Sequence, residues 1–164
     1  MRKLRLLITE ECERSCPGCC NKDWDLDGLP IVDDFTGYDE ILLTGGEPML
    51  VTDKVTDLID EIRQQTDAAS IYMYTADVRC PRTLRLLLEV YLDGVTVTLH
   101  EQEDVAPFLR FAEVVEGIEE VGKSLRLNVF KGIKLEYPKG WIVKDNITWI
   151  KDCPLPEGET FGRC

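Results

Sequence analysis

Residues 3–19 read KLRLLITEECERSCPGC, an apolar run of strand type that is followed within three residues by the first of three cysteines. A second apolar run, EILLT at 40–44, leads directly into GGEP at 45–48, here called the glycine motif. Short apolar runs bounded by polar or glycine-rich residues are typical of buried strands. Both special stretches therefore follow a predicted strand, and the rest of the chain indicates what kind of sheet these strands form.

Further strand-like runs alternate with helical segments along the chain. Strands are predicted at 70–75, 94–100 and 124–130, and helices at 53–65, 82–92 and 103–117. In the first helix the apolar residues recur at one-faced spacing, and Thr52 or Asp53 is the expected cap. Strands alternating with helices predict an α/β fold with a mostly parallel sheet, either doubly wound or curled into a partial barrel.

Polar residues follow the third and fourth predicted strands as well. Thr75 and Asp77 come at the end of the third strand, and Thr98 and His100 at the end of the fourth. Ligands gather at the carboxyl ends of parallel strands, so we expect these residues near the cysteines and the glycine motif. His100 is the single histidine and the candidate catalytic residue, although a lone histidine is more often structural. Asn128 in the fifth strand is a weaker candidate.

Composition limits the class of protein. A chain of 164 residues fits one domain, with residues 1–130 as its core and 131–164 adding a strand or hairpin and an extended tail. No apolar run approaches the roughly 18 residues that a membrane span requires, and the start is a poor signal peptide, so we expect a cytoplasmic protein. The net charge of −12 with dispersed basic residues argues against nucleic acid as a partner.

Seven cysteines in such a chain favour metal or redox chemistry over a disulfide framework. Three thiolates spaced as Cys12, Cys16 and Cys19 can hold three corners of a [4Fe–4S] cluster and leave the fourth iron open. The alternatives are a structural zinc site, unligated thiols and a ferredoxin-like electron carrier. A zinc site could recruit Cys20, Cys153 or His100 as a further ligand.

The remaining cysteines, Cys20, Cys80, Cys153 and Cys164, lack the local pairing of an auxiliary cluster site. We therefore expect them to be buried or surface thiols.

The C-x3-C-x2-C pattern after the first strand, with GGEP after the second, resembles the radical S-adenosylmethionine (SAM) superfamily. The resemblance implies that Cys12, Cys16 and Cys19 hold the cluster and that Gly45, Gly46, Glu47 and Pro48 hold the SAM amino group. It also implies a short, open partial (β/α) barrel, in which the reduced cluster splits SAM to give a 5′-deoxyadenosyl radical. A flavodoxin- or ferredoxin-type protein is then the expected electron donor.

A narrower likeness concerns residues 12–24 and the glycine motif. CPGC followed by Asn21 and Trp24 is similar to the small activating enzymes of anaerobic ribonucleotide reductases, which place a radical on a glycine of a large partner. The chain departs from the expected patterns at Gly18, Cys20 and Glu47.

Two other functions remain open. One is a stand-alone radical SAM enzyme on a small molecule or modified base, similar to 7-carboxy-7-deazaguanine synthase and working as a homodimer. The other is a non-catalytic iron–sulfur or zinc-binding module.

Overall fold

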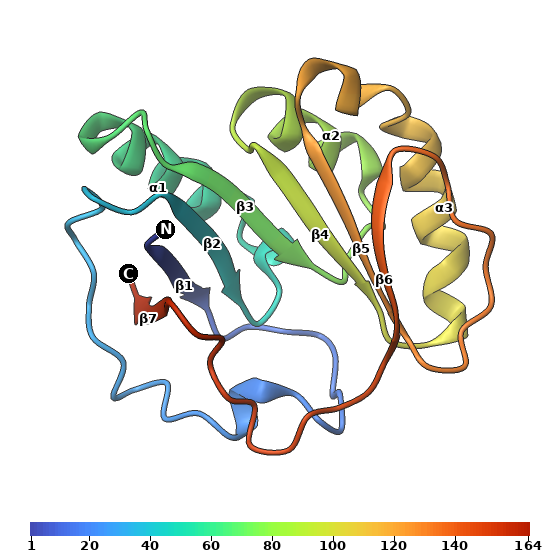
Figure 1. The fold of residues 1–164 in the computed structure, drawn as a ribbon, viewed down its shortest axis with the longest axis horizontal. Helices are drawn as coiled ribbons and strands as arrows, with labels where there is room; N and C mark the ends of the chain where they lie inside the picture. The colour runs from blue at the N-terminus through green and yellow to red at the C-terminus, as the bar shows by residue number, and fades with distance from the viewer. The chain divides into compact units, whose positions relative to one another are not determined.

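The structure is a computed structural model that describes all of residues 1–164. The chain forms two compact units, one made of residues 1–71 and 149–164 and the other of residues 72–148. The division falls within strand β3 (Ser70–Thr75), and Figure 1 shows the elements of both units. Each unit is described by itself below.

The first unit has three parallel strands with β1 (Lys3–Thr9) in the middle. β2 (Glu40–Gly45) pairs with one side of β1, and β7 (Glu159–Arg163) pairs with the other. Its helical elements are η1 (Cys20–Lys22), η2 (Pro48–Leu50) and α1 (Thr52–Gln65). β1 and β2 are rich in apolar residues because most of their side chains are buried, whereas β7 is largely polar and has one buried residue. Their fully buried residues include Leu4, Leu6, Ile8, Ile41, Leu42 and Leu43.

Helix α1 forms where the apolar spacing predicts it. Its buried residues are Val55, Leu58, Ile59 and Ile62, which lie on one face. The predicted cap is wrong, because Val51 occupies the N-cap position and no side chain caps the helix. The preceding turn, η2, leads directly into α1, and the amide of Val55 donates to the carbonyl of Val51.

The second unit contains β3, β4 (Gly94–Leu99), β5 (Ser124–Phe130) and β6 (Trp141–Ile147), paired in this order and all parallel. Its helices are α2 (Pro81–Val90), η3 (Gln102–Asp104), α3 (Val105–Val114) and η4 (Ile118–Val121). Figure 1 shows α2 and α3 on the same face of these strands. This is expected because α2 connects β3 to β4 and α3 connects β4 to β5, and right-handed connections that add strands in one direction place their helices on one face. The rings of Phe108 and Trp141 pack edge to face, with centroids 4.8 Å apart.

The C-terminal part contains two parallel strands rather than a hairpin. β6 pairs with β5, and β7 pairs with β1. The stretch from Cys153, which was expected as an extended tail, therefore ends in a paired strand. Two side-chain contacts fix β7 in this place. Phe161 stacks edge-on against Trp24 at a centroid distance of 4.6 Å, and Glu159 accepts a 2.9 Å hydrogen bond from Arg5.

The predicted fold class is confirmed. The strands are parallel, and β6 and β7 each pair on one side only, so the α/β sheet is open, as a short partial barrel requires. The division at residue 130 stays a prediction.

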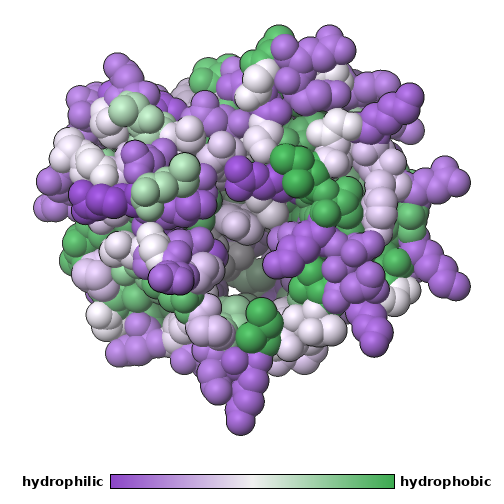
Figure 2. Space-filling view, viewed as in Figure 1, coloured by the Kyte–Doolittle hydropathy of each residue, from purple (hydrophilic) through white to green (hydrophobic).

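The surface is mainly hydrophilic. Figure 2 shows polar residues over the visible face, with apolar residues in separate spots. None of the helices has both the length and the apolar character needed to span a membrane.

Candidate functional site

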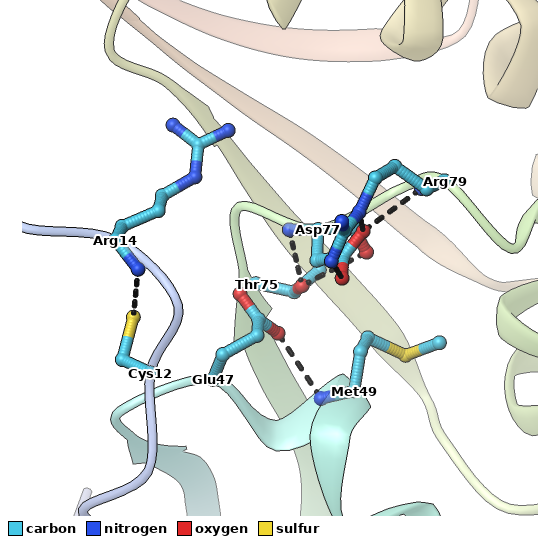
Figure 3. A network of polar contacts seen from close by, with 7 residues as sticks. All are labelled: Cys12, Arg14, Glu47, Met49, Thr75, Asp77 and Arg79. Atoms are coloured by element: carbon cyan, nitrogen blue, oxygen red, sulfur yellow. Dashed lines mark hydrogen bonds and ion pairs between the residues drawn. The ribbon is translucent and has the colours of Figure 1, made fainter.

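The cysteine loop, residues 10–21, follows the carboxyl end of β1. Cys12 is exposed, Cys16 and Cys19 are half-buried, and none of the three forms a disulfide. The Cys12 Sγ accepts a 3.4 Å hydrogen bond from the Arg14 amide, which Figure 3 shows. The carbonyl of Cys16 accepts hydrogen bonds from the Cys19 amide at 3.3 Å and from Lys22 Nζ at 2.8 Å. Hydrogen bonds within the loop therefore order its backbone, and none of these three thiols is used in a disulfide.

The glycine motif lies directly against the start of the cysteine loop. The Gly46 amide donates to the Thr9 carbonyl at 2.7 Å, and the Glu47 amide donates to the Glu11 carbonyl at 2.6 Å. A Cβ on Gly45 would overlap the Thr9 carbonyl oxygen, and one on Gly46 would overlap that of Glu11. Gly45 also has a φ of 148°, which side chains rarely allow. Both glycines are thus required for the close approach of the two backbones.

The far end of the cysteine loop is joined to the same motif. Asn21 Nδ2 donates to the Gly45 carbonyl at 2.9 Å. The Glu47 side chain is 5% exposed, and its Oε1 accepts a 3.1 Å hydrogen bond from the Met49 amide (Figure 3). Pro48 is buried and begins η2. The motif therefore holds both ends of the cysteine loop and carries a buried carboxylate.

A disulfide joins Cys20 to Cys153, with Cα atoms 5.4 Å apart. The expectation that both are thiols is wrong. The two residues are 133 positions apart in sequence, and the parallel pairing of β7 with β1 returns the chain end to this unit. The carbonyl of Cys153 also accepts a 3.0 Å hydrogen bond from Trp24 Nε1. A disulfide sulfur is not a metal-binding thiolate, so this pair is unavailable as zinc ligands in the structure.

An aromatic side chain packs against the cysteine loop at Gly18, between the second and third cysteines. A Cβ on Gly18 would lie 2.5 Å from the Cγ and Cδ2 atoms of Trp149. Gly18 is one of the positions where the chain departs from the family pattern, and the space beside it is filled by this indole. No signal in the sequence relates the two residues.

In the second unit, Thr75 and Asp77 form a polar turn at the carboxyl end of β3. Thr75 is buried, and its Oγ1 accepts a 2.9 Å hydrogen bond from the Asp77 amide. The Asp77 carboxylate accepts from Arg79 Nε at 2.9 Å and from Arg79 Nη2 at 2.6 Å (Figure 3). This bidentate pair orients the carboxylate.

The candidates on β4 and β5 are neighbours in register. Thr98 pairs with Asn128, whose Nδ2 donates to Thr98 Oγ1 at 3.4 Å. His100 follows β4, its amide donates to Asp104 Oδ2 at 2.8 Å, and its ring lies 4.9 Å from that of Phe130. Asp104 belongs to a capping box at η3, a role that the sequence analysis did not identify.

The donors of the cysteine loop fit a cubane cluster in number and chemistry, because Cys12, Cys16 and Cys19 lie on one loop and none of them is in a disulfide. As they stand, however, no three His, Cys, Asp or Glu side chains are arranged to hold a metal ion. Binding therefore requires the loop to bring its thiols together.

Comparison with known proteins gives two matches. The model of the 4Fe-4S single cluster domain matches residues 3–104. GTP 3′,8-cyclase from Synechococcus sp. (strain CC9902) is 30% identical over 151 residues, which covers 84% of this chain and 43% of the cyclase. The chain thus spans less than half the length of this curated relative.

The matched region contains both sequence features on which the resemblance rests, the cysteine loop and the glycine motif. The resemblance to the radical SAM superfamily is confirmed, and with it the implied cofactors, a [4Fe–4S] cluster and SAM. The chain belongs to the 4Fe-4S single cluster domain family.

Proposed function

We propose that this protein cleaves SAM reductively and directs the resulting 5′-deoxyadenosyl radical to a hydrogen atom of its substrate. The observation that carries the proposal is the double attachment of the cysteine loop to the glycine motif. Backbone hydrogen bonds to Thr9 and Glu11 hold the start of the loop, and Asn21 holds its far end. Cluster ligands and a SAM-binding motif must lie side by side for this chemistry.

The residues have separate roles in this proposal. Cys12, Cys16 and Cys19 hold the cluster, which when bound and reduced supplies the electron that splits the sulfonium of SAM. The buried Glu47 carboxylate, oriented by the Met49 amide, accepts hydrogen bonds from the SAM ammonium group. The close backbone packing at the two glycines keeps this carboxylate beside the loop.

The substrate that we favour is a glycine of a large partner protein. The local likeness of residues 12–24 to activating enzymes supports this choice. So does the open sheet, since unpaired edges at β6 and β7 leave the fold without barrel closure. His100, at the end of β4, is the candidate residue for contact with SAM or substrate. A low-potential flavodoxin- or ferredoxin-type protein would supply the electron, in the cytoplasm.

A small-molecule substrate is the second candidate, with a homodimer closing the open side. The likeness to GTP 3′,8-cyclase favours it, because that relative acts on a nucleotide. Only 43% of the cyclase is covered, so its substrate is carried over as a candidate alone.

The first test is anaerobic reconstitution with iron and sulfide, reduction by dithionite in the presence of SAM, and an assay for 5′-deoxyadenosine. Wild-type protein should form the product. Cys16→Ala should reduce it by at least about a hundredfold, because one cluster ligand is lost.

Cys80→Ala is the matched control, since Cys80 is a free, exposed thiol outside the cysteine loop. It should leave the yield unchanged. Equal product from Cys16→Ala and wild type would contradict the proposal. So would one tightly bound zinc in place of the cluster.

A further inference from the structure

The segment around the third cysteine of the loop is restrained at two points by the C-terminal segment, residues 149–158. Trp149 covers Gly18, immediately before Cys19, and the disulfide from Cys153 holds Cys20, immediately after it. Cys19 therefore lies between a packing contact and a covalent bond. A loop that must bring its thiols together has least freedom at this residue.

The C-terminal segment is itself held firmly. The carbonyl of Cys153 accepts the hydrogen bond from Trp24, and β7 follows in the sheet. Asp152 and Cys153 have φ values of 62° and 33°. Aspartate tolerates this left-handed backbone, whereas cysteine rarely adopts it unless its surroundings impose it. The disulfide is one such restraint. Its reduction would remove the covalent hold on both the segment and Cys20.

We propose that the Cys20–Cys153 disulfide is a redox clamp on the cysteine loop. When oxidised, it holds the loop in a form in which the three thiols are not arranged to hold a metal ion. When reduced, it frees the segment from Cys16 to Cys20 to close around the cluster. The inference rests on the proposed use of Cys12, Cys16 and Cys19 as cluster ligands.

The chemistry is ordinary thiol–disulfide exchange with a dithiol reductant. Cys20 is half-buried whereas Cys153 is 6% exposed, so the reductant thiolate attacks the Cys20 sulfur and Cys153 leaves as a thiolate. The second thiol of the reductant then displaces Cys20 and completes its own disulfide. Two electrons and two protons pass to the protein, which gains two thiols, and an oxidised dithiol reverses the exchange.

The test compares the apo-protein in two redox forms and uses cobalt(II) alone as the probe, because sulfide would itself reduce the disulfide. Peptide mapping first confirms that the oxidised form carries the Cys20–Cys153 bond and retains five free cysteines. Thiolate–cobalt absorption bands then report binding at the cysteine loop. Oxidised wild type should bind cobalt at least about fivefold more weakly than reduced wild type, because deforming a restrained loop opposes binding.

The matched control is the double variant Cys20→Ser/Cys153→Ser, taken through the same oxidation. It cannot form the clamp, so it should bind cobalt as tightly as reduced wild type. If it loses binding as oxidised wild type does, oxidation has acted on the loop thiols and the proposal is overturned. Weaker binding by oxidised wild type supports the clamp only together with the double variant, because reduction also supplies the Cys20 and Cys153 thiols as cobalt ligands. Equal binding by the two wild-type forms overturns the clamp without any variant.

Two further outcomes would overturn the clamp. One is equal cobalt affinity in both wild-type forms, and the other is oxidised protein without a Cys20–Cys153 bond.

The variant Cys16→Ala separates a failure of the clamp from a failure of the proposed function. If reduced Cys16→Ala binds cobalt as wild type does, the cysteine loop is not the metal site and the proposed function fails first. If cobalt binding depends on Cys16 but is the same in the oxidised and reduced proteins, the clamp is overturned and the proposed function stands.

Discussion

The connection from β1 to β2 and the connection from β4 to β5 perform the same topological task in different ways. Residues 100–123 join β4 to β5 through helix α3, which buries Phe108 and Phe111 completely. Residues 10–39 join β1 to β2 with no α-helix, only the short η1. The first connection is held by apolar burial. The second buries one large apolar side chain, Phe35, and is otherwise held mainly by backbone hydrogen bonds, the Asn21 contact and a disulfide.

The difference explains how the chemistry is accommodated. A helix would fix its cysteines at helical spacing and direct its apolar face to the sheet. A loop joined to the glycine motif at both ends keeps its position while its thiols stay free and its middle can adjust. The cost is that a few polar contacts replace a broad packed surface, so single changes at those contacts should have large effects.

The largest effect is expected from Gly46→Ala. The added methyl would overlap the Glu11 carbonyl and disturb the hydrogen bond from the Gly46 amide to Thr9. We expect a loss of more than about 3 kcal/mol in the free energy of unfolding, and almost no iron after reconstitution. Chemical denaturation and iron analysis measure the two quantities.

Gly117→Ala is the control in the other connection. Gly117 has a φ of 82° and nothing within 4 Å of its added Cβ, so the substitution introduces backbone strain without overlap. It should destabilise by about 1–2 kcal/mol and leave the iron content unchanged. If both variants retain iron equally, the close approach of motif and loop does not support cluster binding.

A smaller effect on the rate of iron loss is expected when an asparagine is replaced in the first unit but not when one is replaced in the second. Asn21→Ala removes the 2.9 Å hydrogen bond to the Gly45 carbonyl, worth about 1 kcal/mol, so iron should pass to a chelator about fivefold faster. Asn128→Ala removes a 3.4 Å contact to Thr98 on neighbouring strands and should not change this rate. The measurement is the absorbance of the chelated iron over time. Equal rates in the two variants would contradict the role given to Asn21.

Much of the fold could be predicted because its signals are local. The apolar spacing from Val55 to Ile62 predicts the buried face of α1, and the strand-like runs predict β1 to β5 in parallel order. The cysteine loop and glycine motif could be placed at strand ends for the same reason. The roles of Thr75, Asp77, Thr98 and His100 stay predictions, since their printed contacts are to other protein groups.

The misses share a different cause, which is long sequence separation. Nothing near Cys153 indicates a partner 133 residues away, and Trp149 has no pattern that relates it to Gly18. The stretch before β7 is rich in proline and glycine and is typical of a tail, but β7 pairs with β1 through contacts across the whole sequence. The pattern of one sequence shows local periodicity, but it does not show which residues far apart in the sequence contact one another.

The smallest expected effect is on the pKa of Asp34, which lies in the β1–β2 connection near its β2 end, away from the cysteines. Asp34 Oδ1 accepts hydrogen bonds from the Thr36 hydroxyl at 2.6 Å and from the Thr36 amide at 2.9 Å. These bonds, the hydroxyl first, lower the pKa of Asp34 below its usual 3.8. A lowered pKa in the folded protein means that this contribution to stability is present above pH 3.8 and is lost as the pH falls through the folded value.

Thr36→Val should therefore raise the pKa of Asp34 towards 3.8 but not to it, because the backbone hydrogen bond remains. An NMR titration of the Asp34 carboxyl carbon measures this pKa. Iron content should also stay at the wild-type level. A change in iron would mean that the two ends of this connection are coupled, and the cysteine loop would then depend on more than its attachment to the glycine motif and the C-terminal segment.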